Sequence, residues 1–139
     1  MKDVTAIGRQ YSDLVREHYL RPRNVGALPQ QSNVGRGQAG SQNEGGLVQF
    51  QVQVDHSGII KAVRFKAYGC GATIAAASWV GETISELALA QAQTLGSNDV
   101  AKALALPPKK IHCAMLVCDA LQAAIADYKS KQESSWISH

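Results

Sequence analysis

The fold is decided by residues 48–84, which read VQFQVQVDHSGIIKAVRFKAYGCGATIAAASWVGETI. Apolar and polar residues alternate from Val48 to Val54, which is the period of two expected of a half-buried strand. A turn follows at Asp55–Gly58, and the alternation resumes over Ile59–Ala67, so this part predicts a β-hairpin. The period then changes, and small apolar residues over Ala72–Ile84 predict a helix.

Further elements are predicted on both sides of this segment. Apolar residues at helical spacing from Tyr11 to Tyr19 predict a helix that Arg21-Pro22 ends. The stretch Asn24–Gly46 is rich in Gly, Gln, Asn and Ser, and it predicts a loop with one short edge strand near Asn33–Gln38. Beyond residue 84 we expect helices over 87–94, over 99–104 with Asn98 as its N-cap, and over 111–131, then a frayed tail over 131–139.

Strands followed by helices predict an α+β domain, in which a small antiparallel sheet of about three strands is packed by helices on one face. The 139 residues suit a single domain over 1–139, long enough to need no disulfide framework. The net charge of +3 is too small to indicate nucleic-acid binding. No run approaches the roughly 18 apolar residues of a membrane span, and no signal or transit segment is visible, so we expect no membrane partner and a cytoplasmic location.

Two features of the loop need an interpretation. No acidic residue lies between Glu17 and Glu44, although three arginines do, so the stretch is either a contact for an acidic partner or a solvated loop. Residues Gly35–Gly40 match the dinucleotide-binding pattern G-x-G-x-x-G, which works only between a strand and a helix. No hydrophobic strand precedes this match and a polar loop follows it, so we exclude a nucleotide site.

Three cysteines indicate thiol chemistry or metal ligation rather than structural disulfides, because the number is odd and the chain shows no secretion signal. Cys70 lies between Gly69 and Gly71 at the predicted strand-to-helix junction. Free amides at a helix start lower the pKa of a thiol. The alternative for Cys70 is a small buried residue in a tight turn.

The pair His112-Cys113 begins the last predicted helix. Adjacent helical side chains point about 100° apart, so both reach one metal only near a helix start. Thiolate and imidazole together suit zinc or iron–sulfur chemistry, and Lys109 and Lys110 can hold Cys113 ionised. The alternative is a capping histidine beside a core cysteine. Cys118 lies about 140° farther round the helix and is interpreted as a core or surface thiol.

Several strings occur in a specific order along nearly the whole chain. They are Tyr11-Ser12 with His18-Tyr19, Pro22-Arg23-Asn24-Val25-Gly26, Asn33-Val34-Gly35, Gly58-Ile59-Ile60, Phe65-Lys66-Ala67-Tyr68-Gly69-Cys70-Gly71, Leu106-Pro107-Pro108, Ile111-His112-Cys113 and Ala123-Ala124-Ile125-Ala126-Asp127-Tyr128-Lys129. In this order they resemble the IscU/NifU-type iron–sulfur cluster assembly scaffolds, whose fold is a three-stranded antiparallel sheet packed by helices.

The resemblance implies a platform that is not an enzyme. A cysteine desulfurase delivers sulfur, iron is supplied, and a transient [2Fe–2S] cluster is built and passed to acceptor apo-proteins. The family's ligands are three cysteines and a nearby histidine; Cys70, His112 and Cys113 match the second cysteine and the His-Cys pair, and Cys113 matches the sulfur acceptor. The segment Leu106-Pro107-Pro108-Lys109-Lys110 resembles the motif bound by a DnaK-like chaperone with its co-chaperone, and departs from it at Lys109, where valine is usual.

The first ligand loop departs from the family. Where the family has Gly-Ala-Pro-Ala-Cys-Gly-Asp, residues 40–46 read Gly-Ser-Gln-Asn-Glu-Gly-Gly, with Glu44 at the first cysteine and Gly46 at the aspartate. A carboxylate can ligate zinc or iron but is harder than a thiolate and suits an iron–sulfur cluster less well. Glu44 is therefore either a replacement ligand or a solvated loop residue.

Three functions are consistent with these residues. The first is a working scaffold in which Glu44 or an exogenous thiol completes the ligand set. The second is a specialised paralogue that binds zinc or the desulfurase and regulates sulfur transfer without building a cluster. The third is a zinc enzyme with an open position on a Cys₂His site, for which the sequence shows no general base.

Overall fold

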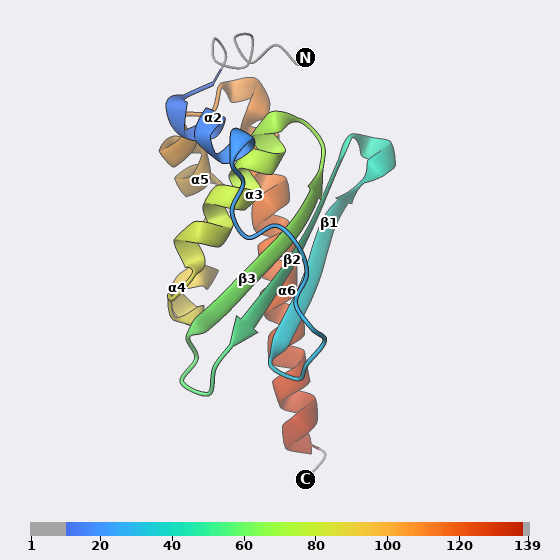
Figure 1. Ribbon diagram of the computed structural model, residues 1–139. Coiled ribbons are helices and arrows are strands. Elements are labelled where there is room, and N and C mark those ends of the chain that lie inside the picture. The colour runs from blue at the N-terminus through green and yellow to red at the C-terminus, as the bar shows by residue number, and fades with distance from the viewer. Residues whose placement is uncertain (1–10, 138–139) are drawn as a thin grey trace.

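The computed structural model describes residues 11–137 (Figure 1). The ends of the predicted domain and of its predicted frayed tail lie outside this range. In chain order the elements are α2 (Asp13–Leu20), β1 (Val34–Ser41), the 3₁₀ turn η1 (Gln42–Glu44), β2 (Gly46–Val54), β3 (Ile60–Tyr68), α3 (Gly71–Ile84), α4 (Leu89–Gln93), α5 (Ser97–Leu104), the 3₁₀ turn η2 (Pro108–Lys110) and α6 (Ile111–Ile137).

The sheet has three antiparallel strands in the order β1-β2-β3, so the predicted α+β fold and its hairpin are confirmed. The alternating residues of β2 do what their period predicts, since its valines and Phe50 are buried while its glutamines face the other side. Phe50 pairs with Phe65 across the hairpin with ring centroids 6.0 Å apart. These residues form the sheet's half of the core.

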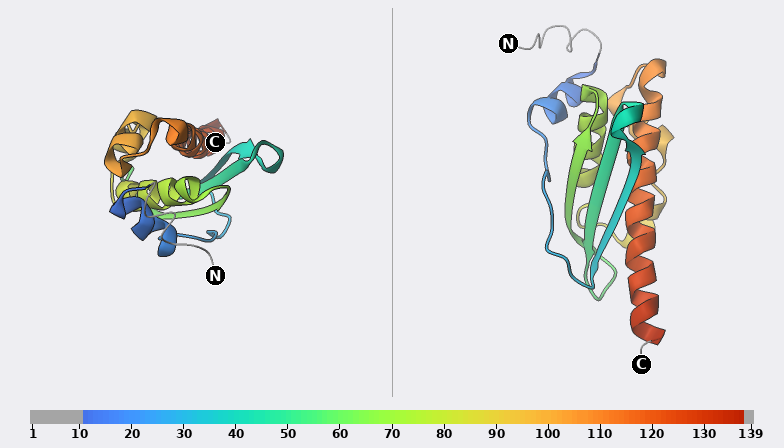
Figure 2. Two further views of the ribbon diagram at one scale, coloured as in Figure 1. Left: turned by 90° about the horizontal axis from the view of Figure 1, so that it is seen from above. Right: turned by 90° about the vertical axis from the view of Figure 1, so that its right-hand side faces the viewer.

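Helices cover one face of the sheet (Figure 2). α6 packs against β1 and β2, while α3 packs against β3 and β2, and α2 lies on α3 rather than on the sheet. Small residues make α3 thin enough to approach the strands, with Ala72, Ala75, Ala76 and Ala77 fully buried. On the opposite face the described chain places only the loop after α2, which runs across the strands (Figure 1).

β1 differs from the prediction. The sequence predicts a short edge strand within a loop, whereas β1 has eight residues and pairs with β2 along its whole length. Two of its inward positions, Gly35 and Gly37, are glycines, because the backbone of α6 passes close to the strand there. A Cβ atom on Gly37 would lie 2.1 Å from the Ala124 amide nitrogen, and one on Gly35 would lie 2.2 Å from the Ala124 carbonyl oxygen. The glycine pattern that matched a nucleotide motif is therefore a helix-packing surface.

α6 also covers the outer edge of β1. The Arg36 backbone amide donates to the Asp127 carboxylate (2.8 Å), and the Lys131 ammonium donates to the Val34 carbonyl (2.8 Å). Gln132 reaches the Ser32 carbonyl in the same way. The unpaired backbone N–H and C=O groups of an edge strand can pair with another chain and so cause aggregation. Here such groups are hydrogen-bonded to the α6 side chains instead. The prediction that α6 ends near Lys131 is wrong, because the helix continues to Ile137 after these contacts.

Two further details correct or qualify the sequence predictions. α5 begins at Ser97 with Gly96 as its N-cap, and the Asp99 carboxylate accepts from the Gly96 amide (2.9 Å), so Asn98 is not the cap. The stretch Pro108–Gln132 has the length and the hydropathy of a membrane span, which the sequence analysis did not anticipate. In this structure it packs against the sheet, as a core helix does.

Candidate functional site

Three separate segments meet at one end of the sheet, at the top of Figure 1. They are the turn η1 between β1 and β2, the junction of β3 with α3, and the start of α6. Between them lies a hollow of about 410 Å³. Its lining residues are Gly40, Glu44, Gly45, Gly46, Cys70, Thr73, Lys110, His112 and Leu116. The structure therefore brings Glu44, Cys70 and His112, which were predicted as site residues, to a single cavity.

The two glycines beside Cys70 have separate structural roles. Cys70 is the N-cap residue of α3, with φ −75° and ψ 169°. Gly69 has φ +152°, a conformation that side-chain-bearing residues rarely adopt. A Cβ atom on Gly71 would lie 3.2 Å from the Tyr19 ring, so glycine lets the ring of α2 close over the junction. Together they turn the chain sharply enough to present the Cys70 sulfur at the start of the helix.

The predicted thiols lie next to each other although 43 positions separate them. The Sγ atoms of Cys70 and Cys113 are 3.6 Å apart, and both cysteines are free. The imidazole Nε2 of His112 is 3.6 Å from Cys113 Sγ, and the Thr73 hydroxyl is 3.6 Å from Cys70 Sγ. His112 is exposed, whereas Cys113 is only 1% exposed and lies under Cys70. In the first turn of α6, the His112 side chain thus points to the surface and the Cys113 side chain points into the core.

The hydrogen bond between the two sulfur atoms shifts their pKa values in opposite directions. The Cys113 thiol donates to Cys70, and this hydrogen bond is the main cause of the lowered pKa of Cys70. The Thr73 hydroxyl and the amides at the start of α3 lower that pKa further. The same hydrogen bond and burial raise the pKa of Cys113. The hydrogen bond therefore favours ionisation of Cys70 over Cys113. The positive charge of Lys110 lowers the pKa of Cys113, so the interpretation that lysines help to ionise Cys113 stays a prediction.

The two lysines of the adjacent 3₁₀ turn differ in their role. Lys110 lines the hollow, and the negative charge of Cys70 raises the pKa of its ammonium group. Lys109 is exposed and does not line the hollow. Thr73 was not predicted as a site residue. It lies three positions after the N-cap Cys70, and a side chain at that position can reach back to the cap residue, so its hydroxyl group could have been recognised from the sequence.

Glu44 lies at the rim of the hollow. Its carboxylate accepts a hydrogen bond from the Ser41 hydroxyl (2.9 Å), while its own amide donates to the same oxygen (3.2 Å). Within the described residues 11–137, no three His, Cys, Asp or Glu side chains are arranged to hold a metal ion in this conformation. Metal ligation by Cys70, His112, Cys113 and Glu44 stays a prediction.

The remaining predicted residues lie outside the hollow or at its border. Cys118 is buried, and burial raises the pKa of its thiol to about 11, so it is a core residue. In the predicted chaperone segment Leu106 is buried while Pro108 and Lys109 are exposed. The segment follows Ala105, which has a left-handed backbone (φ +51°). It therefore lies on the surface with only its leucine anchored in the core.

Comparison with known proteins agrees with this architecture. The NifU-like N-terminal domain family matches residues 10–135. The iron–sulfur cluster assembly scaffold protein IscU of Escherichia coli (strain K12) is 47% identical over 125 residues, which cover 89% of this chain and 98% of that protein. The chain belongs to the IscU/NifU family.

A mitochondrial relative and a solved structure are also similar to this chain. The mitochondrial iron sulfur cluster assembly protein 2 of Saccharomyces cerevisiae is 44% identical over 132 residues, covering 94% of this chain and 85% of that protein. The crystal structure of a NifU-like protein (N-terminal) from Brucella abortus superposes with a TM-score of 0.69 at 12% identity, covering 90% of this chain and 98% of that chain. The latter likeness concerns the fold alone.

Proposed function

We propose that this chain is an iron–sulfur cluster assembly scaffold that receives sulfur from a cysteine desulfurase, holds a transient [2Fe–2S] cluster and passes it to acceptor apo-proteins. The observation that carries the proposal is the approach of Cys70 to Cys113, with Sγ atoms 3.6 Å apart, beside His112 and above a hollow that opens to solvent. Two thiols and an imidazole suit iron–sulfur chemistry, and the chain retains them in a family whose named members assemble such clusters.

The residues of the hollow have distinct tasks in this proposal. Cys70, Cys113 and His112 are the cluster ligands, and Glu44 is the fourth donor, which reaches the cluster once η1 turns it away from Ser41. Lys110 offsets the negative charge that collects at the thiolates. A carboxylate in the place of a thiolate holds iron less firmly, which makes the bound cluster easier to release.

Sulfur delivery is a transfer between sulfur atoms. A thiolate of this chain attacks the outer sulfur of a desulfurase persulfide, so a new S–S bond forms here and the desulfurase cysteine leaves as a thiolate. The family resemblance assigns this role to Cys113, whereas the lowered pKa of Cys70 favours Cys70 as the attacking thiolate in this conformation. Cys113 accepts sulfur directly only if the start of α6 opens, since its side chain is 1% exposed. Persulfide mapping by mass spectrometry distinguishes the two routes.

The proposal includes partners and a setting. The exposed part of Leu106-Pro107-Pro108-Lys109-Lys110 binds a DnaK-like chaperone with its co-chaperone, more weakly than a sequence with valine at position 109 does. The protein has no catalytic turnover of its own. Its location is cytoplasmic, although relatives include proteins named as mitochondrial.

The decisive experiment is anaerobic reconstitution with iron, cysteine and a desulfurase, followed by assay of iron, zinc and acid-labile sulfide. We expect iron and sulfide in near-equal amounts, lost in Cys70→Ser and retained in Cys118→Ser, because Cys118 lies in the core away from the hollow. Unchanged metal content in Cys70→Ser would exclude the assigned site.

A second function is favoured by Glu44. With no thiol at this position and no ready metal geometry among the described side chains, the chain also fits a paralogue that binds zinc or the desulfurase and regulates sulfur transfer. Zinc without sulfide after reconstitution, together with an altered rate of the desulfurase, would establish this function instead of the scaffold.

A further inference from the structure

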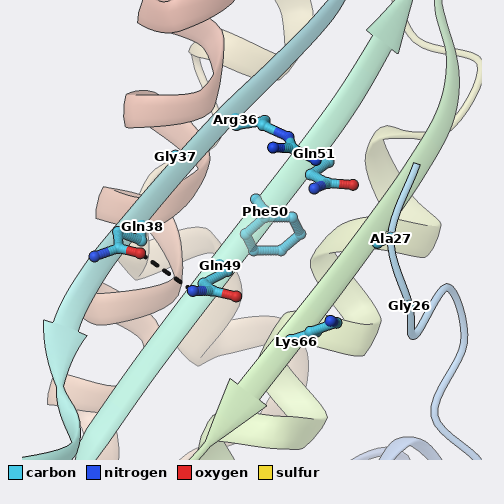
Figure 3. Close-up of a pocket in the computed structure, with 9 residues that line it drawn as sticks. All are labelled: Gly26, Ala27, Arg36, Gly37, Gln38, Gln49, Phe50, Gln51 and Lys66. Carbon is cyan, nitrogen blue, oxygen red and sulfur yellow. Dashed lines mark hydrogen bonds between the residues drawn. The ribbon is translucent and has the colours of Figure 1, made fainter. Parts of the chain in front are cut away.

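The face of the sheet that carries no helix in the described chain has an ordered array of long polar side chains (Figure 3). The strand register places Arg36 opposite Gln51, and Gln51 opposite Arg64. Two residues along, Gln38 lies opposite Gln49, which lies opposite Lys66. Successive side chains of a strand point to opposite faces, and the β2 residues that alternate with Gln49 and Gln51 are buried. Both rows therefore face away from the core.

Apart from Arg64, the side chains of these rows line the floor of a second hollow, of about 400 Å³. It is lined by Gly26, Ala27, Arg36, Gly37, Gln38, Gln49, Phe50, Gln51 and Lys66. Its volume is at the lower end of the range for small-molecule sites. It shares no lining residue with the hollow at Cys70, so it is a separate site.

One wall of this hollow is the loop after α2, and this wall is anchored. The Gly26 amide donates to the Phe65 carbonyl (2.9 Å), and the Phe65 amide donates to the Asn24 carbonyl (2.8 Å). The Leu28 amide donates to the side-chain oxygen of Gln51. Because that oxygen is occupied, the donors that Gln51 presents are its NH₂ hydrogens. The Gln49 NH₂ group is in turn held by Gln38 (3.2 Å).

The lining carries positive charge without a counter-charge. Arg36 and Lys66 are its two ionised side chains, and it contains no carboxylate. Among the side chains described, up to Gln132, neither of them forms an ion pair, whereas Lys61 pairs with Glu86 and Arg23 with Glu17. The loop that forms the wall comes from the acid-free stretch between Glu17 and Glu44. The hollow is therefore positive and lined mostly by hydrogen-bonding groups.

We propose that this hollow binds a ligand carrying two or more carboxylates. Arg36 and Lys66 stem from the outer strands, separated by β2 and by two residues along the strands, so their backbones are about 12 Å apart. An elongated ligand with carboxylates at both ends reaches both cations, whereas a compact phosphate reaches one. The guanidinium group binds a carboxylate with two parallel hydrogen bonds, and the glutamine amides bind the groups between. The carboxylates belong either to a free polycarboxylate or to adjacent acidic side chains of a protein partner.

Backbone amide NMR of the metal-free full-length chain at low ionic strength tests this proposal. Citrate and a hexaglutamate peptide are the probes, and inorganic phosphate is the comparison anion. We expect shifts at Gly26, Ala27 and Gly37, a dissociation constant below about 10 mM for at least one probe, and weaker binding of phosphate. Arg36→Gln and Lys66→Gln each weaken binding by about threefold to tenfold, while Lys102→Gln on α5, which removes the same charge from an exposed position, does not.

The binding results distinguish a free ligand from a protein partner and show whether the hollow is a site at all. Binding of citrate with these variant effects identifies a free polycarboxylate as the ligand source, and preference for the peptide identifies a protein partner. The proposal is overturned if neither probe binds, if phosphate binds as well as citrate, or if Arg36→Gln and Lys66→Gln bind like the wild type. Shifts that spread over the surface rather than gather at the hollow would overturn it as well.

Discussion

Gly37→Ala tests whether the contact between β1 and α6 governs the stability of this protein. The added Cβ atom would lie 2.1 Å from the Ala124 nitrogen and 2.4 Å from the Ala123 carbonyl carbon. Carbon atoms in contact normally stay about 3.5–4.0 Å apart. Since the opposing atoms belong to the backbone of a helix, no single side chain can rotate away, and α6 must move off β1 by about 1 Å.

The cost of this shift has two parts. Overpacking of a tight core costs about 1–3 kcal/mol and occasionally more. Displacing α6 also weakens the hydrogen bonds that it makes to the β1 edge through Asp127 and Lys131, at about 1 kcal/mol each. We expect Gly37→Ala to lower the free energy of unfolding by about 3–5 kcal/mol, a large share of the 5–15 kcal/mol typical of a domain.

Urea unfolding of the metal-free protein, followed by circular dichroism, measures this change. With an m-value of about 2 kcal/mol/M, the midpoint is expected to fall by about 1.5–2.5 M. Gly81→Ala is the matched control, because Gly81 lies inside α3 and its Cβ atom would be 3.4 Å or more from any neighbour. That variant is expected to be neutral or up to about 1 kcal/mol more stable. A loss below about 1 kcal/mol in Gly37→Ala would refute the reasoning.

Three other outcomes follow from the site and the sheet edge. Because the pKa of Cys70 is lowered, its thiolate persists as the pH falls below the ordinary thiol range, and iodoacetamide should label it rapidly at pH 6.5. Cys113→Ala removes the hydrogen-bond partner and should slow this labelling about tenfold or more, while buried Cys118 stays unlabelled in both proteins. Glu44→Cys should lengthen the lifetime of a reconstituted cluster measured by visible absorption, and an equal or shorter lifetime would mean that residue 44 is not a ligand. Asp127→Ala leaves a β1 amide without its acceptor and should cost about 1 kcal/mol in urea unfolding, whereas full stability would show that water replaces the carboxylate.

Much of the fold is predictable because its signals are local. The period of two in β2 and β3, the change of period at Cys70 and the proline pair before α6 each depend on residues next to one another in the chain. The full length of β1 escaped prediction for a physical reason. Two of its inner positions, Gly35 and Gly37, are glycines whose purpose is visible only when α6, about 90 positions later, is packed against them.

The site shows the same division. The type and order of its residues, Cys70 at a helix start and His112-Cys113 at another, are readable from the chain and indicate thiol and metal chemistry. Their approach to 3.6 Å is a tertiary property, since it depends on α3 and α6 packing on the same sheet face. The position of the proton depends on that packing too. A thiol becomes a thiolate where its neighbours donate hydrogen bonds, and the sequence does not reveal which of the two cysteines receives them.

The amino-acid sequence alone thus specifies the α+β order, the hairpin and the chemical type of the candidate donor residues. Three-dimensional packing specifies the length of β1, the extension of α6 to Ile137, the ionised cysteine and the polar hollow on the open face of the sheet. The difference follows from range. Periodicity and capping act over a few residues, whereas close approach, burial and shared protons depend on atoms that only the folded chain brings together.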